Sequence, residues 1–141
     1  MPHEAVPAET VETFLASLKR CLAEPEFLVK FYARFMDSSD EVRAKFRGTD
    51  MTQQARVLAD SLYVLAVAAQ GRERSPARGD LPRLAALHGR HGLDIRPGLY
   101  GVWLDCLVAS ARDHDPAFSP AVEHAWRATL GPGIEEMISG Y

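Results

Sequence analysis

Hydrophobic residues recur at every third or fourth position along almost the whole chain, which is the spacing of one face of an α-helix. The first such stripe consists of Val11, Phe14, Leu15, Leu18 and Leu22. The sequence contains no strand-length alternation of apolar and polar residues and no visible internal repeat. The pattern therefore predicts an all-α fold of roughly six to eight crossed helices.

Helix-start signals divide the region that follows this stripe. Pro25 suits the first turn of a second helix, which ends near "DSSD" at 37–40. Ser39 is the expected cap of a short helix that runs toward Phe46. The second helix has an aromatic and mostly buried surface made of Phe27, Leu28, Phe31, Tyr32, Phe35 and Met36.

A longer helix is predicted to begin after the loop "RGTD" at 47–50. Asp50 is its expected cap, and Gln53 three residues later completes the pattern of a capping box. Its buried face is expected to contain Leu58, Leu62, Leu65 and Ala69.

Proline marks the remaining helix starts. One helix has Pro82 in its first turn, another begins at Pro97, and the Ser-Pro pair at 119–120 opens the last helix. The "GPG" at 131–133 is expected to kink or end that last helix. The helix around Pro82 carries Leu81, Leu84, Leu87 and then His88.

Length and charge limit the classes of protein to consider. The 141 residues suit one domain, 1–141, in which we expect residues 1–8 to be a loose N-terminal segment. The formal net charge is −3, and the basic cluster "GRERSPARGD" at 71–80 is broken by glycine and proline and lacks aromatic residues. We therefore expect no nucleic-acid partner.

The two cysteines and the start of the chain indicate a cytoplasmic protein. Cys21 and Cys106 both sit inside apolar-periodic stretches, so buried free thiols are favoured over a disulfide or a metal pair. The first residues lack the basic and apolar regions of a signal peptide, and no stretch approaches the about 18 apolar residues of a membrane span. We expect no association with a membrane.

Two histidines, His88 and His91, stand three positions apart at the end of a leucine-spaced run. A pair at this spacing can share a metal ion on one helix face, but a closed zinc site needs about four ligands. The sequence places no cysteine or carboxylate cluster beside the pair. Taken alone, a histidine in this position is more often a hydrogen-bonded core residue than a ligand.

Five segments of the sequence, taken in order, favour a metal-ligand role for one of these histidines over a core role. Their order and spacing resemble those of the single-domain bacterial globins related to the haem domain of flavohaemoglobins, over nearly the whole chain. The resemblance implies a globin fold, with the helices packed around a haem pocket, and haem b with its iron as the cofactor. The segments are "FLVKFYARFM" at 27–36, "EVRAKF" at 41–46, "TDMTQQARVLADSL" at 49–62, "LPRLAALH" at 81–88 and "IRPGLYGVW" at 95–103.

The resemblance implies that a neutral imidazole binds the haem iron from a helix that packs leucines on the porphyrin. His88 fits this role as the metal ligand, with Leu84 one turn before it. His91 is the alternative, because counting forward from "LP" as in flavohaemoglobin-like sequences ends on it. The subgroup pattern around "LHGRHGLDIRPGLYGVW" favours His88, and the other histidine would then lie near the propionates or in solvent.

On the opposite side of the haem, the resemblance implies hydrogen-bond donors to a bound gas in an apolar pocket. Tyr32 and Gln54 are the expected donors, with Leu58 as a wall and Phe46 pressed on the porphyrin. Gln53 is a rival to Gln54, but the capping box gives it another partner. The structural alternatives are a core tyrosine bonded to a backbone carbonyl and an ordinary exposed helix glutamine.

These assignments predict a protein that reversibly binds O2, CO or NO and has no catalytic residue of its own. As an enzyme it would oxidise NO with bound O2, which requires a separate reductase; as a sensor it would signal through a partner. Outside haem chemistry, the alternative is an all-α interaction domain with a core histidine. The sequence leaves the oligomeric state open, a homodimer included.

Overall fold

The computed structural model describes residues 5–70 and 95–139 of the chain. This part of the chain contains helices and no strand, as the hydrophobic spacing predicted. The helices are α1 (Ala8–Leu22), α2 (Phe27–Asp37), α3 (Asp40–Lys45), α4 (Met51–Ala69), α6 (Pro97–His114) and α7 (Pro120–Ser139).

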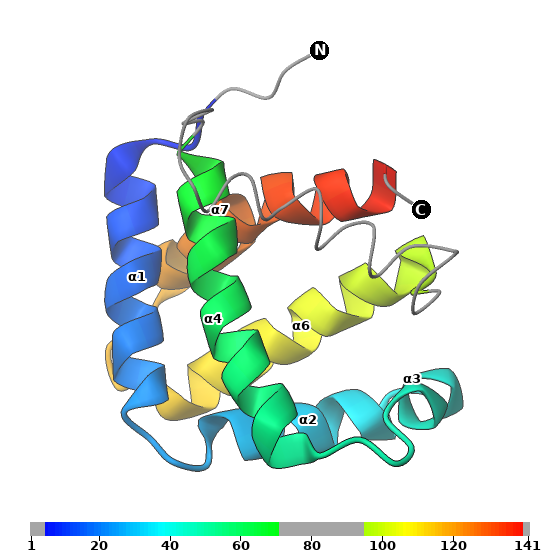
Figure 1. Cartoon of the computed structure of the whole chain (residues 1–141). Helices are drawn as coiled ribbons and strands as arrows, with labels where there is room; N and C mark the ends of the chain where they lie inside the picture. Colours follow the sequence, from blue (N-terminus) through cyan, green and yellow to red (C-terminus); the bar gives the residue numbers. More distant parts are fainter. Residues whose placement is uncertain (1–4, 71–94, 140–141) are drawn as a thin grey trace.

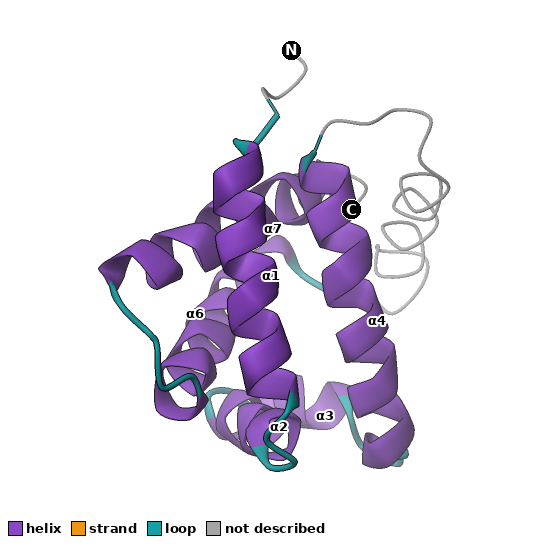
Figure 2. Ribbon diagram, turned by 90° about the vertical axis from the view of Figure 1, so that its left-hand side faces the viewer, coloured by secondary structure: helices purple, strands orange, loops and turns teal. Residues whose placement is uncertain are grey.

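The helices cross one another in two layers. Helices α1 and α4 run side by side in opposite directions, in front of α6 and α7 (Figure 1). Helix α2 crosses below them, packs against α6 and leads directly into α3. The view turned by 90° shows α1 and α4 still adjacent, with α6 on the other side of α1 (Figure 2). This is the crossed arrangement expected for an all-α protein.

The core lies where these helices cross. Phe14 of α1 meets Trp126 of α7 edge-on, with ring centroids 4.8 Å apart. Cys21 and Cys106 are buried free thiols, as the sequence predicted. The largest fully buried side chains are Trp126, Phe14, Phe27, Phe31, Leu18, Leu62, Leu65, Leu107 and Leu130.

The predicted caps are present at the helix starts. The Ser39 hydroxyl accepts hydrogen bonds from the backbone N–H groups of Glu41 and Val42. The Asp50 carboxylate accepts from those of Thr52 and Gln53. Each cap satisfies N–H groups that the first turn of a helix leaves without a partner.

Of the predicted proline starts, Pro97 and Pro120 coincide with the first residues of α6 and α7, and Pro82 lies outside the described residues. The proline before α2 does not coincide with the start of its helix. Pro25 lies in a turn, α2 begins at Phe27, and the Phe27 N–H donates to the Glu24 carbonyl across that turn. Pro25 therefore precedes the helix instead of occupying its first turn.

The "GPG" at 131–133 was predicted to kink or end the last helix, and it does not end it. Helix α7 contains Pro132 and continues to Ser139, with Ile134 and Met137 buried beyond the proline. A Cβ atom on Gly133 would collide with the Leu65 side chain of α4, so the two helices approach closely there. Burial of the last turns against α4 offsets the hydrogen bond that a proline removes from a helix.

The start of the chain is anchored to α4. The Val6 N–H donates to the Ala69 carbonyl at 2.9 Å, and the Val6 side chain packs against the core. Residues 1–4, the remainder of the segment that we expected to be loose, lie outside the described residues.

A buried polar network connects α1, the end of α6 and α7. Ser17 donates to Asp115 Oδ2 at 2.6 Å and accepts from Trp126 Nε1 at 2.9 Å. Arg20 donates to both Asp115 oxygens, Nε to Oδ1 at 2.6 Å and Nη2 to Oδ2 at 2.9 Å, and Ala117 N–H donates to Oδ1 at 2.8 Å. The Asp115 side chain is fully buried, so these bonds replace its hydration.

These bonds determine the ionisation of Asp115. Burial alone raises the pKa of its carboxyl, but the hydrogen bonds from Arg20, Ser17 and Ala117 outweigh burial and hold that pKa below its usual value. The carboxylate is therefore ionised in the folded protein at neutral pH.

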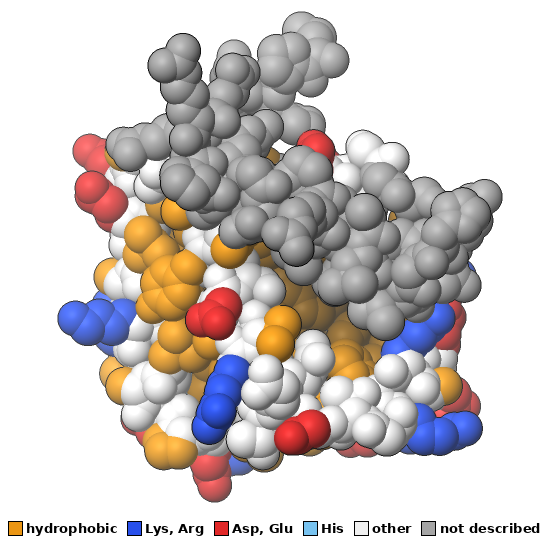
Figure 3. Space-filling view, in the orientation of Figure 1, with side chains coloured by type: hydrophobic (Ala, Val, Ile, Leu, Met, Phe, Trp, Pro, Cys, Tyr) orange, Lys and Arg blue, Asp and Glu red, His pale blue; other side chains and the backbone are white. Residues whose placement is uncertain are grey.

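The surface of the described residues carries both signs of charge. Lysine and arginine side chains alternate with aspartate and glutamate side chains over the face in Figure 3, and they do not gather in one basic patch. None of the described helices has the length and hydropathy needed to cross a bilayer.

Candidate functional site

Tyr32 lies on the buried face of α2 and has 5% of its surface exposed. Its hydroxyl donates to the backbone carbonyl of Gln54, at the start of α4, over 3.4 Å. That O···O distance is long, because hydroxyl hydrogen bonds in proteins usually span about 2.5–3.0 Å. Burial raises the pKa of the Tyr32 phenol to about 12, so the hydroxyl keeps its proton at physiological pH.

Aromatic rings surround this phenol. Phe46 meets the Tyr32 ring edge-on, with centroids 5.4 Å apart and planes at 74°. Phe31 meets it on another side at 4.9 Å and 65°. Phe46 also contacts Phe35 at 6.2 Å. The rings from α2 and the end of α3 thus form one cluster, in which Tyr32 meets both of its neighbours edge-on.

Phe46 is held there by the end of α3. It is the C-terminal cap of that helix, and its N–H donates to the Arg43 carbonyl at 3.3 Å. The loop that follows turns at Gly48, whose positive φ lies in the left-handed region that glycine adopts without strain. This short helix and its turn place Phe46 over Tyr32.

Helix α4 contributes residues to this site in addition to those from α2 and the end of α3. Gln54 is half-buried, Gln53 is exposed, and Leu58 one turn further on is buried. The choice of Gln54 over Gln53 as the donor to a bound gas stays a prediction. Tyr32, however, bonds to the Gln54 backbone, which is the arrangement we named as its purely structural alternative.

The structure thus brings Tyr32, Phe46 and Gln54 together, with Leu58 on the same helix as Gln54. The other predicted site residues, Leu84, His88 and His91, lie outside the described residues. Among residues 5–70 and 95–139, no group of three or more His, Cys, Asp or Glu side chains is arranged to hold a metal ion.

The aromatic residues of α6 pack on the core. Trp103 meets Phe31 edge-on, with centroids 6.5 Å apart. Tyr100 is buried in the first turns of α6, and burial raises its pKa to about 12. Trp103 thus connects α6 to the interior at α2.

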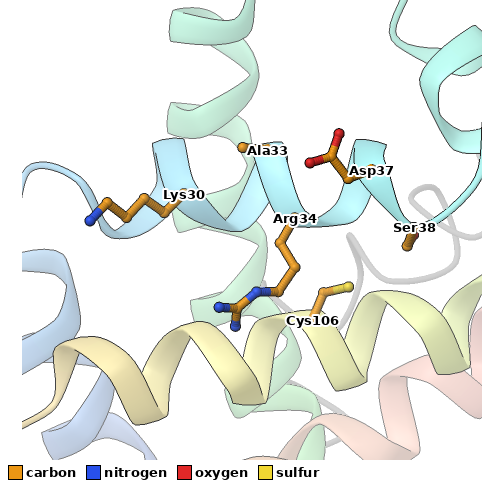
Figure 4. A pocket seen from close by; sticks show the side chains of 6 residues that line it. All are labelled: Lys30, Ala33, Arg34, Asp37, Ser38 and Cys106. Carbon is orange, nitrogen blue, oxygen red and sulfur yellow. The ribbon is translucent and has the colours of Figure 1, made fainter.

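A pocket of about 550 Å³ lies between α2 and α6. Arg34 and Cys106 point into the space between these helices, whereas Lys30 and Asp37 point away from it (Figure 4). Arg34 also pairs with Asp113 at 2.8 Å. The polar groups therefore do not converge on one point. The cavity is lined by Lys30, Ala33, Arg34, Asp37, Ser38 and Cys106.

Sequence reasoning missed an ion pair close to the aromatic cluster. Arg96, the residue before α6, donates from Nε and Nη2 to the carboxylate of Glu41 in the first turn of α3. The two residues are 55 positions apart, and no local pattern marks either of them. Only the assembled fold shows that they meet.

Comparisons with known proteins add a relative. No protein-family model matches the chain, and no curated protein matches it. Among solved structures, the chain is similar to a Pseudomonas aeruginosa protein that is described as structurally highly homologous to a human hemoglobin. The two chains are 38% identical, the match covers 94% of this chain and 98% of the other, and the TM-score is 0.88.

Proposed function

We propose that this chain, which belongs to the same family as the hemoglobin-like protein of Pseudomonas aeruginosa and has the globin fold, binds haem b and, through it, O2 and other diatomic gases. The observation that carries the proposal is the Tyr32 hydroxyl, a buried and protonated donor with only a long bond to the Gln54 backbone. We also propose that the chain is related to the haem domain of flavohaemoglobins, as the resemblance of its sequence implies.

The described residues of the site suit a haem on chemical grounds. A porphyrin is a flat, mostly apolar group, and Phe46, Leu58 and the rings beside Tyr32 offer apolar and aromatic surface. No residue of this set is ionised at neutral pH, because the Tyr32 phenol has a pKa of about 12 and the others do not titrate. A gas with a small negative charge fits such a pocket when one donor points at it.

Haem iron held by an imidazole supplies the gas-binding chemistry. His88 is the ligand that we propose, with Leu84 against the porphyrin and His91 as the competing ligand. The Tyr32 hydroxyl would leave the Gln54 carbonyl and donate a hydrogen bond to the gas, and the Gln54 side-chain amide would donate a second one. Two donors of roughly 1 kcal/mol each favour slow release and high affinity over bulk transport.

An absorption spectrum tests the proposal most directly. The purified protein would be recorded in the ferric, dithionite-reduced and CO-bound forms, together with the His88→Ala and His91→Ala variants. We expect a Soret band that shifts with CO in the parent, survives in His91→Ala and collapses in His88→Ala. Loss of the Soret band in His91→Ala alone would identify His91 as the ligand. A parent protein that stays colourless after haem supplementation would overturn the proposed function.

A further inference from the structure

The ion pair between Glu41 and Arg96 has the geometry of a specific contact. Nε of Arg96 lies 2.7 Å from Oε2 and 3.0 Å from Oε1 of Glu41, and Nη2 lies 2.6 Å from Oε1. Two guanidinium nitrogens therefore face the two oxygens of one carboxylate, which is the bidentate arrangement that fixes direction as well as distance. The Glu41 side chain is 35% exposed and the Arg96 side chain 55% exposed, so the pair is open to solvent and salt.

The pair connects α3 and α6, which are otherwise held together mainly through their contacts with α2. Both α3 and α6 pack extensively against α2, whereas α3 and α6 have little direct contact within the described part of the chain. Glu41 is in the first turn of α3, and Arg96 immediately precedes α6. The ion pair thus joins α3 directly to the start of α6, in addition to their shared contacts with α2. It restricts how far α3 can move away from α6.

Movement of α3 would reach the candidate gas site through Phe46. That residue caps α3, and its ring lies edge-on against Tyr32 at 5.4 Å. Among the described residues, the 3.4 Å bond to Gln54 is the one hydrogen bond that fixes the direction of the Tyr32 hydroxyl, so ring contacts contribute strongly to its position. A chain of contacts therefore runs from Arg96 through Glu41, α3 and Phe46 to the hydroxyl.

We propose that the Glu41–Arg96 ion pair positions Phe46 and Tyr32 at the gas site and makes the rate of gas release depend on ionic strength. This inference rests on the proposed function, since it needs a gas at the Tyr32 hydroxyl. Glu41 and Arg96 are positioning residues: they act on the gas through α3 and Phe46.

The test compares Glu41→Gln, Arg96→Gln and the double variant with the parent at 20 mM and 500 mM NaCl. Two quantities are measured: amide hydrogen exchange in residues 40–46 of the protein as purified, and O2 dissociation followed by stopped-flow absorbance. At 20 mM NaCl we expect each single variant to speed both processes about two- to fivefold, the range that an exposed pair of good geometry supports.

Two further comparisons make the result specific to the pair. The double variant should speed both processes by less than the product of the two single effects, because each single variant already removes the contact between Glu41 and Arg96. The parent should approach the variants at 500 mM NaCl, since salt screens an exposed pair. Arg127→Gln is the matched control: Arg127 of α7 bonds Asp105 of α6 at 2.9 Å, with 40% of its side chain exposed, and it should change neither quantity.

The outcomes separate the inference from the function on which it rests. Faster exchange with unchanged O2 dissociation would overturn the positioning role and leave a merely structural pair, while the function stands. Variants that match Arg127→Gln in both measurements would overturn it as well. A parent that binds no haem would overturn the function and the positioning role together, and hydrogen exchange would still report whether the pair restrains α3.

Discussion

Two buried hydroxyl groups in this molecule are used in opposite ways. The Ser17 hydroxyl donates to Asp115 at 2.6 Å and accepts from Trp126 at 2.9 Å, so both of its hydrogen-bonding functions are met at short distance. The Tyr32 hydroxyl donates over 3.4 Å to a backbone carbonyl of Gln54. Both are buried, but only the first has the geometry of a strong bond.

The contrast separates a polar group that holds the fold from one that is available to a ligand. Buried polar groups are normally satisfied within the protein, because an unsatisfied one costs about 1–3 kcal/mol. The Ser17 network meets this requirement fully and connects three segments of the chain. The Tyr32 phenol meets it only weakly, and it can exchange the long bond for a shorter one at little cost. The difference predicts large stability losses at the network and small ones at Tyr32.

The largest effect is expected for Asp115→Asn. The substitution removes the charge that Arg20 and the Ser17 hydroxyl bond. Losing one partner of a buried ion pair costs about 3–5 kcal/mol. Arg20 is 35% exposed and regains some hydration, so we expect a loss of about 2–3 kcal/mol in the free energy of unfolding measured with urea. Asp113→Asn is the control, because that carboxylate pairs with Arg34 in solvent, and exposed pairs of this kind contribute little to stability.

The same carboxylate predicts an acid dependence of stability. The pKa of Asp115 in the folded protein lies below its value of about 3.9 in an unfolded chain, so the unfolded state binds its proton first as the pH falls. Its stabilising contribution is fully present above about pH 5 and is lost as the pH falls through the folded pKa. The free energies of unfolding of the parent and Asp115→Asn, measured with urea, should therefore differ at pH 7. The difference should shrink as the pH falls below about 4. An equal difference at pH 3 and pH 7 would contradict this account.

An intermediate effect is expected for Ser17→Ala. The change leaves the Trp126 Nε1–H without its acceptor and removes one donor from Asp115, while Arg20 and Ala117 still bond the carboxylate. We expect a loss of about 1 kcal/mol, the low end of the cost of one buried group left unpaired. Thermal unfolding followed by circular dichroism would measure it. A loss as large as that of Asp115→Asn would mean that the hydroxyl, and not the charge, dominates the network.

The helices of this fold could be predicted from the sequence because their signals are local. Caps at Ser39 and Asp50 and the proline at Pro97 depend on residues within one turn, and the structure confirms each of them. The end of the last helix could not be predicted in this way, because it depends on contacts with residues far away in the sequence. Pro132 remains helical because Ile134, beyond it, is buried where α7 packs on α4.

The site could be predicted only in part for the same reason. The burial of Tyr32 followed from the apolar face of α2, and its proximity to Phe46 was expected from the family resemblance. The bond from Tyr32 to the Gln54 carbonyl depends on how α2 crosses α4, and the contact between Glu41 and Arg96 depends on where α3 meets the start of α6. Neither crossing has a signal within the local sequence.

The smallest effect on stability is expected for Tyr32→Phe. The variant keeps the ring and its contact with Phe46 and loses only the long bond. The Gln54 carbonyl lies in α4, where helix carbonyls accept from the N–H four residues later. We therefore expect a change of about 0.5 kcal/mol in the free energy of unfolding, the low end for one hydrogen bond, measured with urea beside Ser17→Ala. A loss as large as that of Ser17→Ala would make the two hydroxyls equivalent and remove the contrast between them.

The same variant should have the largest effect on gas release, because the hydroxyl that contributes least to the fold is the one we assign to the ligand. Loss of a hydrogen bond worth about 1 kcal/mol or slightly more corresponds to O2 dissociation about five- to tenfold faster. Stopped-flow displacement of O2 by CO measures this rate. Tyr63→Phe on α4, with 44% of the tyrosine exposed, is the control and should release O2 like the parent. If Tyr32→Phe released O2 at the parental rate while remaining folded, its hydroxyl would be structural, and Gln54 would be the remaining donor on that side of the haem.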